Sequence, residues 1–107
     1  MTKQPSTSRS ETTALLQLAG ILVAPYQAKL DQWQTRVAVL KARRSARRAD
    51  TKDESAEASK LNGLVIVARG ALLAEQRSAD AAVAQHSLVR DVDRALKRLS
   101  DDLADLT

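Results

Sequence analysis

The chain has 107 residues and a formal net charge of +4, and aromatic residues make up only 2% of it. Because aromatic residues supply much of the propensity for strands and all of the stacking on bases, this composition excludes an all-β barrel and an aromatic nucleic-acid platform. The absence of cysteine excludes disulfides, thiolate metal sites and cysteine nucleophiles. Alanine and leucine, strong helix formers, dominate with 19 and 15 copies. We therefore expect an all-α, cytoplasmic protein, with no apolar run near the ~20 residues that span a bilayer.

The first ten residues are polar, and we expect residues 1–10 to form a flexible arm. Ser8 and Glu11 have the spacing of a capping box, which predicts a first helix over residues 11–24. Leucines follow one broad stripe of this helix, so we expect it to be buried against other helices. Pro25 is expected to end or kink the helix, because proline lacks the amide hydrogen and clashes with the preceding turn.

A second helix is predicted over residues 26–49 by large side chains at alternating spacings of four and three. This first apolar seam consists of Tyr26, Leu30, Trp33, Val37 and Leu40. The same spacing then reaches Arg44 and Arg47, so the seam becomes basic at its end.

The stretch Asp50–Ser59 is polar and net acidic, and it favours a turn, with an exposed helical bridge as the alternative. A third helix is predicted over residues 54–76 and is apolar on nearly every side, which indicates deep burial or a subunit contact. Ala56, Gly63 and Gly70 lie seven residues apart, so they share one face on which another backbone can approach closely.

A fourth helix is predicted over residues 79–105. Its apolar residues form a second seam, which consists of Val89, Val92, Leu96, Leu99 and Leu103, and the same spacing continues to Leu106. The other faces alternate in charge, as is typical of a solvated helix, and His86 is interpreted as an ordinary polar position on it. The fold expected is a small helical bundle or helical hairpin with short coiled-coil seams, which completes its core by self-association into a homo-oligomer.

One cluster of basic side chains predicts a binding function. Six basic residues lie on the second helix, and no acidic residue occurs between positions 37 and 49: Arg36, Lys41, Arg43, Arg44, Arg47 and Arg48. Guanidinium groups engage two phosphate oxygens at once, so this cluster predicts binding to the DNA backbone. The alternative is a solvated helix face that pairs with the acidic residues between Asp50 and Glu57.

The sequence supports a catalytic function less than it supports binding to DNA. The carboxylate pairs Asp91/Asp93 and Asp101/Asp102 are explained by ordinary charge alternation along a helix. The sequence contains no glycine-rich phosphate loop, no HExxH motif and no nucleophile elbow. We expect no catalytic residue, no metal site and no cofactor.

Two stretches resemble the small mobilisation accessory proteins of conjugative plasmids, the TraD/MobC-like components of relaxosomes. One is the apolar segment Lys60–Ala68, and the other is Leu88–Leu96, which resembles an Arg-Asp-x-Asp-Arg-Ala-Leu ending. With the basic helix before them, this order of parts covers about two-thirds of the chain. The resemblance implies a helper that binds near a transfer origin and assists a relaxase in opening or nicking DNA.

The sequence thus leads to two hypotheses. The first is an oligomeric DNA-binding accessory protein of plasmid transfer that contacts phosphates through its basic helix. The second is a non-enzymatic coiled-coil adaptor or secretion-system subunit that binds protein partners through its apolar seams. The arginines distinguish the two hypotheses, since they are either free on one face or tied to Asp53, Glu54 and Glu57.

Overall fold

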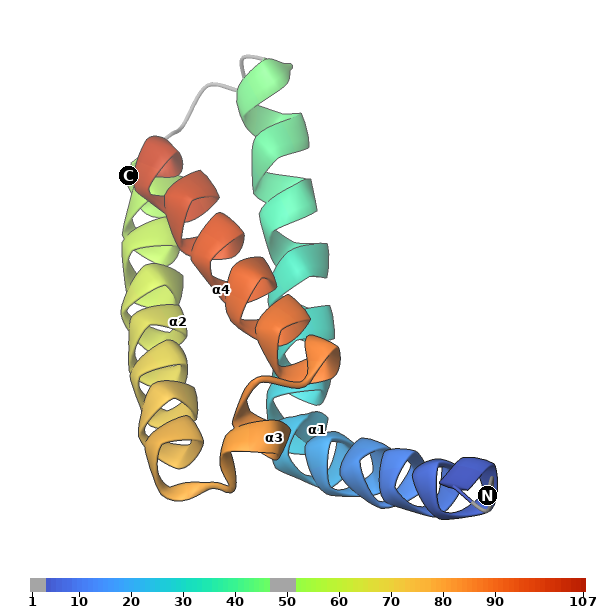
Figure 1. The fold of residues 1–107 in the computed structure, drawn as a ribbon. Helices are drawn as coiled ribbons and strands as arrows, with labels where there is room; N and C mark the ends of the chain where they lie inside the picture. The colour runs from blue at the N-terminus through green and yellow to red at the C-terminus, as the bar shows by residue number, and fades with distance from the viewer. Residues whose placement is uncertain (1–3, 47–51) are drawn as a thin grey trace.

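Four helices make up the computed structural model, which describes residues 4–46 and 52–107 (Figure 1). The helices are α1 (Gln4–Ser45), α2 (Lys52–Ser78), the short α3 (Ala81–Ala84) and α4 (Ser87–Leu106). No strand occurs in these two ranges, so the expected all-α class is confirmed. No helix within them is long and apolar enough to cross a membrane.

The last helix, α4, is the central packing element of the bundle. It packs against both α1 and α2, which contact each other much less (Figure 1). Its buried face carries the whole second seam together with Leu106, whereas its opposite face is charged and exposed. The first seam packs against it, with Leu30, Val37 and Leu40 buried and Trp33 half-buried. Both predicted seams therefore lie in one intrachain core.

The first helix continues through Pro25, so the two helices predicted over residues 11–24 and 26–49 are one. Proline removes only the hydrogen bond to the carbonyl of Ile21, and the apolar stripes on both sides of it still pack in the core. Figure 1 shows α1 bending between its blue first part and its cyan continuation, which is the expected effect of a proline inside a helix.

The first part of α1 gives the molecule its elongated outline. It runs away from the other long helices, with Ala19 and Val23 buried in a cluster that includes Val83 of α3 (Figure 1). The radius of gyration is 18.1 Å, against about 13 Å for a compact domain of this length. Residues 4–10 of the predicted arm belong to α1 in the structure, and residues 1–3 lie outside the described residues.

Two other predicted boundaries are wrong. The turn expected over residues 50–59 is helical from Lys52, because this stretch lacks glycine and proline and places Asp53 and Glu54 in the favourable first turn; residues 50 and 51 lie outside the described ranges. The helix expected over residues 79–105 is broken before α4. Asp80 accepts a hydrogen bond from the amide of Ala82 (2.9 Å) and thereby caps α3.

His86 is not the helical position that was expected. Its Nδ1 atom accepts a hydrogen bond from the amide of Leu88 at 3.1 Å, and its backbone is extended (φ −61°, ψ 144°). The side chain thus satisfies one of the free amides at the start of α4, and the chain changes direction there.

Candidate functional site

The basic segment of α1 is the candidate site that the sequence singled out. Four of its six predicted residues are described, namely Arg36, Lys41, Arg43 and Arg44, and each of them contacts another part of the chain. Arg47 and Arg48 lie outside the described residues. The contacts of the four residues decide what this segment can offer to a ligand.

Arg36 binds the carboxylate of Glu57 on α2 with two nitrogens. Its Nε donates to one oxygen, and its Nη2 donates to the other at 2.7 Å. This hydrogen-bonded pair lowers the pKa of Glu57 below its ordinary value and raises that of Arg36, chiefly through the hydrogen bond itself. The side chains keep 40% and 33% of their exposure, so the pair lies at the rim of the contact between α1 and α2.

Arg43 and Lys41 face different helices. The Nη1 of Arg43 lies 3.6 Å from a carboxylate oxygen of Glu54, near the start of α2. The Nζ of Lys41 donates to Asp102 of α4 at 3.1 Å. Asp102 belongs to the acidic end of α4, where negative charge opposes the helix dipole, so a lysine beside it is stabilising.

Arg44 closes the end of α4. Its Nη2 donates to the carbonyl oxygen of Leu106 at 2.8 Å, and the hydroxyl of Ser55 donates to the same oxygen at 3.3 Å. This carbonyl is one of those that a helix leaves without a partner at its end. Because Arg44 follows Leu40 on the apolar seam, its stem is half-buried while its head caps α4.

These contacts give the basic segment a structural role. The pairs join α1 to the acidic start of α2 and to the acidic end of α4, and three of the four cations still keep 40–54% of their side chains exposed. Sequence analysis anticipated Glu54 and Glu57 as partners, but it missed Asp102 and the carbonyl of Leu106. Both lie about 60 residues from the cations that they meet, and no periodic pattern signals such a pairing.

Apolar side chains are exposed in two places that the sequence did not separate. Leu16, Leu18 and Ile21 are 49, 52 and 72% exposed on the first part of α1. Leu64, Ile66 and Val67 are 48, 56 and 71% exposed on α2. Since residues of this kind are ordinarily buried, the two clusters are candidate contact surfaces.

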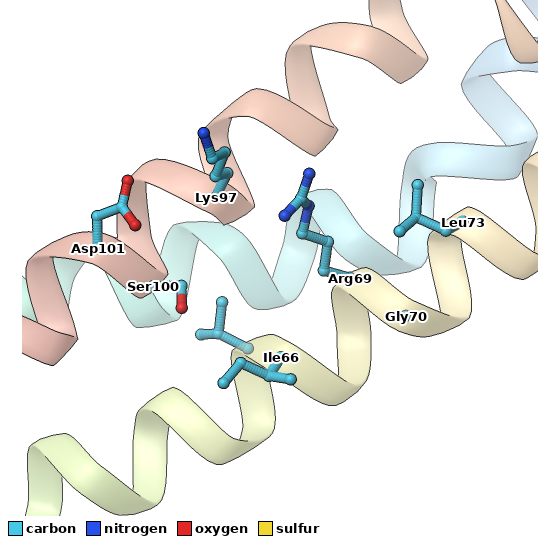
Figure 2. Close-up of a pocket in the computed structure, with 8 residues that line it drawn as sticks. Ile66, Arg69, Gly70, Leu73, Lys97, Ser100 and Asp101 are labelled. Carbon is cyan, nitrogen blue, oxygen red and sulfur yellow. The ribbon is translucent and has the colours of Figure 1, made fainter.

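An open groove of about 330 Å³ lies between α2 and α4 (Figure 2). Ile66, Gly70 and Leu73 line its α2 side, and Lys97 and Asp101 stand on its α4 side. The Nε of Arg69 donates to Asp93 at 2.8 Å, and this bond raises the pKa of the guanidinium.

The polar groups of this groove hold the two helices together. The hydroxyl of Ser100 donates to the side-chain oxygen of Asn62 at 2.7 Å, so its proton is directed at an amide rather than at a base. Among the side chains that the structure describes, no group of three His, Asp or Glu residues is placed to hold a metal ion. The groove therefore has an apolar wall on its α2 side and charged side chains on its α4 side.

Comparison with known proteins assigns this chain to no family. No family model, no curated protein and no solved structure matches the chain.

Proposed function

We propose that this chain is a non-enzymatic helical adaptor that binds another protein through the apolar surface of the first part of α1, in the cytoplasm. The observation that carries the proposal is the exposure of Leu16, Leu18 and Ile21 on a helix that projects from the bundle. Leu18 and Ile21 are three residues apart and therefore share one side of this helix, and we call this pair the α1 docking surface; Leu16 lies on another side of the helix.

The chemistry of this part of α1 favours a protein partner. Residues 12–28 contain no charged side chain, so the surface offers nothing to phosphates or to a charged peptide. A run of 17 uncharged residues spans roughly 25 Å as a helix, which is the length of a typical helix-in-groove contact. The partner expected is an apolar groove or the apolar face of another helix.

DNA binding is the second candidate, and one observation favours it. Arg36, Lys41 and Arg43 remain 40, 54 and 48% exposed, and exposed ion pairs of this kind contribute little to stability. Phosphates can therefore replace their carboxylate partners at small cost. This candidate retains the role in plasmid transfer that the resemblance implies. It ranks second because each phosphate contact by these residues requires an intrachain pair to break.

Photo-crosslinking in the source cell tests the proposal. A photoreactive residue at position 21 is expected to form a discrete adduct with another protein, whereas the same residue at the exposed Arg90 of α4 is the matched control. The adduct is expected to disappear in the Leu18→Asp variant and to persist in Arg43→Ala.

Salt separates the two candidates when the crosslinking is repeated in a lysate of the same cells. An apolar contact is expected to persist between ~0.1 and ~1 M salt, where the Debye length falls from about 10 to 3 Å, whereas phosphate contacts are lost. Absence of any protein adduct at position 21, or an equal yield at position 90, contradicts the adaptor proposal.

A further inference from the structure

The side of α2 that faces away from α1 and α4 is exposed along its length. We call it the outer face of α2, and it consists of Ala56, Lys60, Gly63, Leu64, Val67, Gly70, Ala71 and Ala74, all of which are exposed. Gly70 lies at the edge of this face, where it also lines the groove toward α4. Lys60 is the single charge among these eight residues. The exposed face of α4, in contrast, carries seven charges: Arg90, Asp91, Arg94, Lys97, Arg98, Asp101 and Asp105. The exposed face of α4 thus has the composition of a solvated surface, and the outer face of α2 has the composition of a contact surface.

The two glycines of the outer face have no role in the fold of a single chain. A Cβ atom added at Gly63 or at Gly70 meets nothing within 4 Å. Glycine in the interior of a helix weakens it relative to alanine, so both positions carry a cost that packing within the chain does not offset. Their place beside Val67, which is 71% exposed, leaves room for the backbone of a second helix.

We propose that the outer face of α2 binds the same face of a second copy of this chain, with the two helices antiparallel and crossing near Val67. Charge complementarity supports this occupant. Lys60 lies seven residues before Val67, and Glu75 lies eight residues after it on the same flank of the helix. A twofold axis through the crossing point therefore brings Lys60 of each copy to Glu75 of the other.

The contacts of Lys60 and Glu75 within one chain leave both side chains available to pair with a second copy. Lys60 is exposed and forms no ion pair with any described residue. Glu75 is exposed and accepts a hydrogen bond from Tyr26, which leaves carboxylate lone pairs for a lysine. Parallel helices would instead place the acidic first turns, with Asp53 and Glu54, side by side. The antiparallel arrangement avoids this repulsion.

The length of the outer face of α2 limits the affinity with which two copies can bind. Nineteen residues from Ala56 to Ala74 span roughly 28 Å of helix. One helix face of this length falls short of the ~800 Å² per partner of a standard interface. The dimer is therefore a weak one that forms and dissociates with concentration, with a dissociation constant of about 1 μM or weaker.

Sedimentation velocity on the full chain, from low to high micromolar concentration, tests the proposal. Wild-type protein is expected to shift from monomer to dimer as its concentration rises, and Val67→Asp is expected to remain monomeric. Ile21→Asp changes an equally exposed apolar residue of the α1 docking surface and is expected to dimerise as wild type does. Circular dichroism of Val67→Asp is expected to match wild type, since the side chain is 71% exposed.

Two further variants test the register and the glycines. Lys60→Glu is expected to weaken the dimer at least several-fold, and the added change Glu75→Lys is expected to restore it. Gly70→Ala is expected to raise the melting temperature of the dilute monomer and yet to weaken the dimer.

The proposal is overturned by wild-type protein that is monomeric at every concentration, by a Val67→Asp variant that still dimerises, or by loss of the dimer in Ile21→Asp. Because crosslinking at position 21 tests the α1 docking surface alone, failure of the dimer and failure of the adaptor function give different results.

Discussion

The cost of replacing Leu96 with alanine measures whether the two apolar seams form a core within one chain. Leu96 lies in the middle of α4, is 0% exposed and belongs to the cluster that joins α1, α2 and α4. The substitution removes three carbon atoms, which at about 0.8 kcal/mol each gives roughly 2.4 kcal/mol for the transfer alone. The cavity left behind raises the expected loss to about 3–4 kcal/mol. Native domains are stable by only about 5–15 kcal/mol, so this is a large fraction of the total.

Urea unfolding followed by circular dichroism provides the measurement, and Leu64→Ala is the matched control. Leu64 has the same side chain but is 48% exposed on the outer face of α2, so its replacement is expected to cost about 1 kcal/mol or less in dilute protein. The loss at Leu96 is expected to be the same at every protein concentration, because its contacts are intrachain. A loss below 1 kcal/mol at Leu96, or one that grows as the protein is diluted, refutes the packing described for α4.

Three further predictions concern individual side chains. Glu57→Gln is expected to lose stability relative to wild type above pH 4.5, and this difference vanishes as the pH falls through the lowered pKa of Glu57 beside Arg36; urea unfolding at a series of pH values measures it. Burial, followed by the Glu75 carboxylate, raises the pKa of Tyr26 to about 12, so its absorbance is expected to titrate near pH 12 and the stability it contributes falls as the pH rises above 10. His86→Ala is expected to cost about 1 kcal/mol in thermal unfolding, because the amide that it caps loses its partner.

The pattern of apolar residues predicted most of the core. Val89, Val92, Leu96, Leu99 and Leu103 are all buried on one side of α4, as their spacing indicates. A helix that packs on one side is periodic in sequence, so its buried face can be recognised without its partner. The sequence could not indicate that the partners of this seam are α1 and α2 of the same chain, since a seam of this kind fits an intrachain and an intersubunit contact equally well.

Most contacts of the basic segment could not be predicted from the spacing of residues in the sequence. The pairing of Arg36 with Glu57 was open as an alternative, because both charges lie near one predicted turn. The contacts of Lys41 and Arg44 with the end of α4 depend on where that helix crosses α1. Local rules for helix ends left both an end and a kink open at Pro25, and α1 continues through it because packing on both sides of the kink outweighs the loss of one hydrogen bond.

The α1 docking surface and the outer face of α2 explain why the first predicted helix has a broad apolar stripe and why the third is apolar on nearly every side. In each helix one stripe packs in the core, and a second stripe, which includes Ile21 or Val67, is exposed. Composition alone does not separate a stripe for folding from a stripe for binding. The direction in which each stripe faces, known from the structure, makes that distinction.

The central proposal is that the basic segment of α1 pairs with α2 and α4 of its own chain in preference to DNA phosphates. Fluorescence anisotropy of a labelled DNA duplex, titrated with the full chain at several salt concentrations, tests this proposal most directly. We expect only the weak, non-specific affinity of about 10⁻⁴–10⁻⁶ M at physiological salt, unchanged in Arg43→Ala. A dissociation constant tighter than roughly 10⁻⁶ M that weakens steeply with salt, and weakens further in Arg43→Ala, would contradict it.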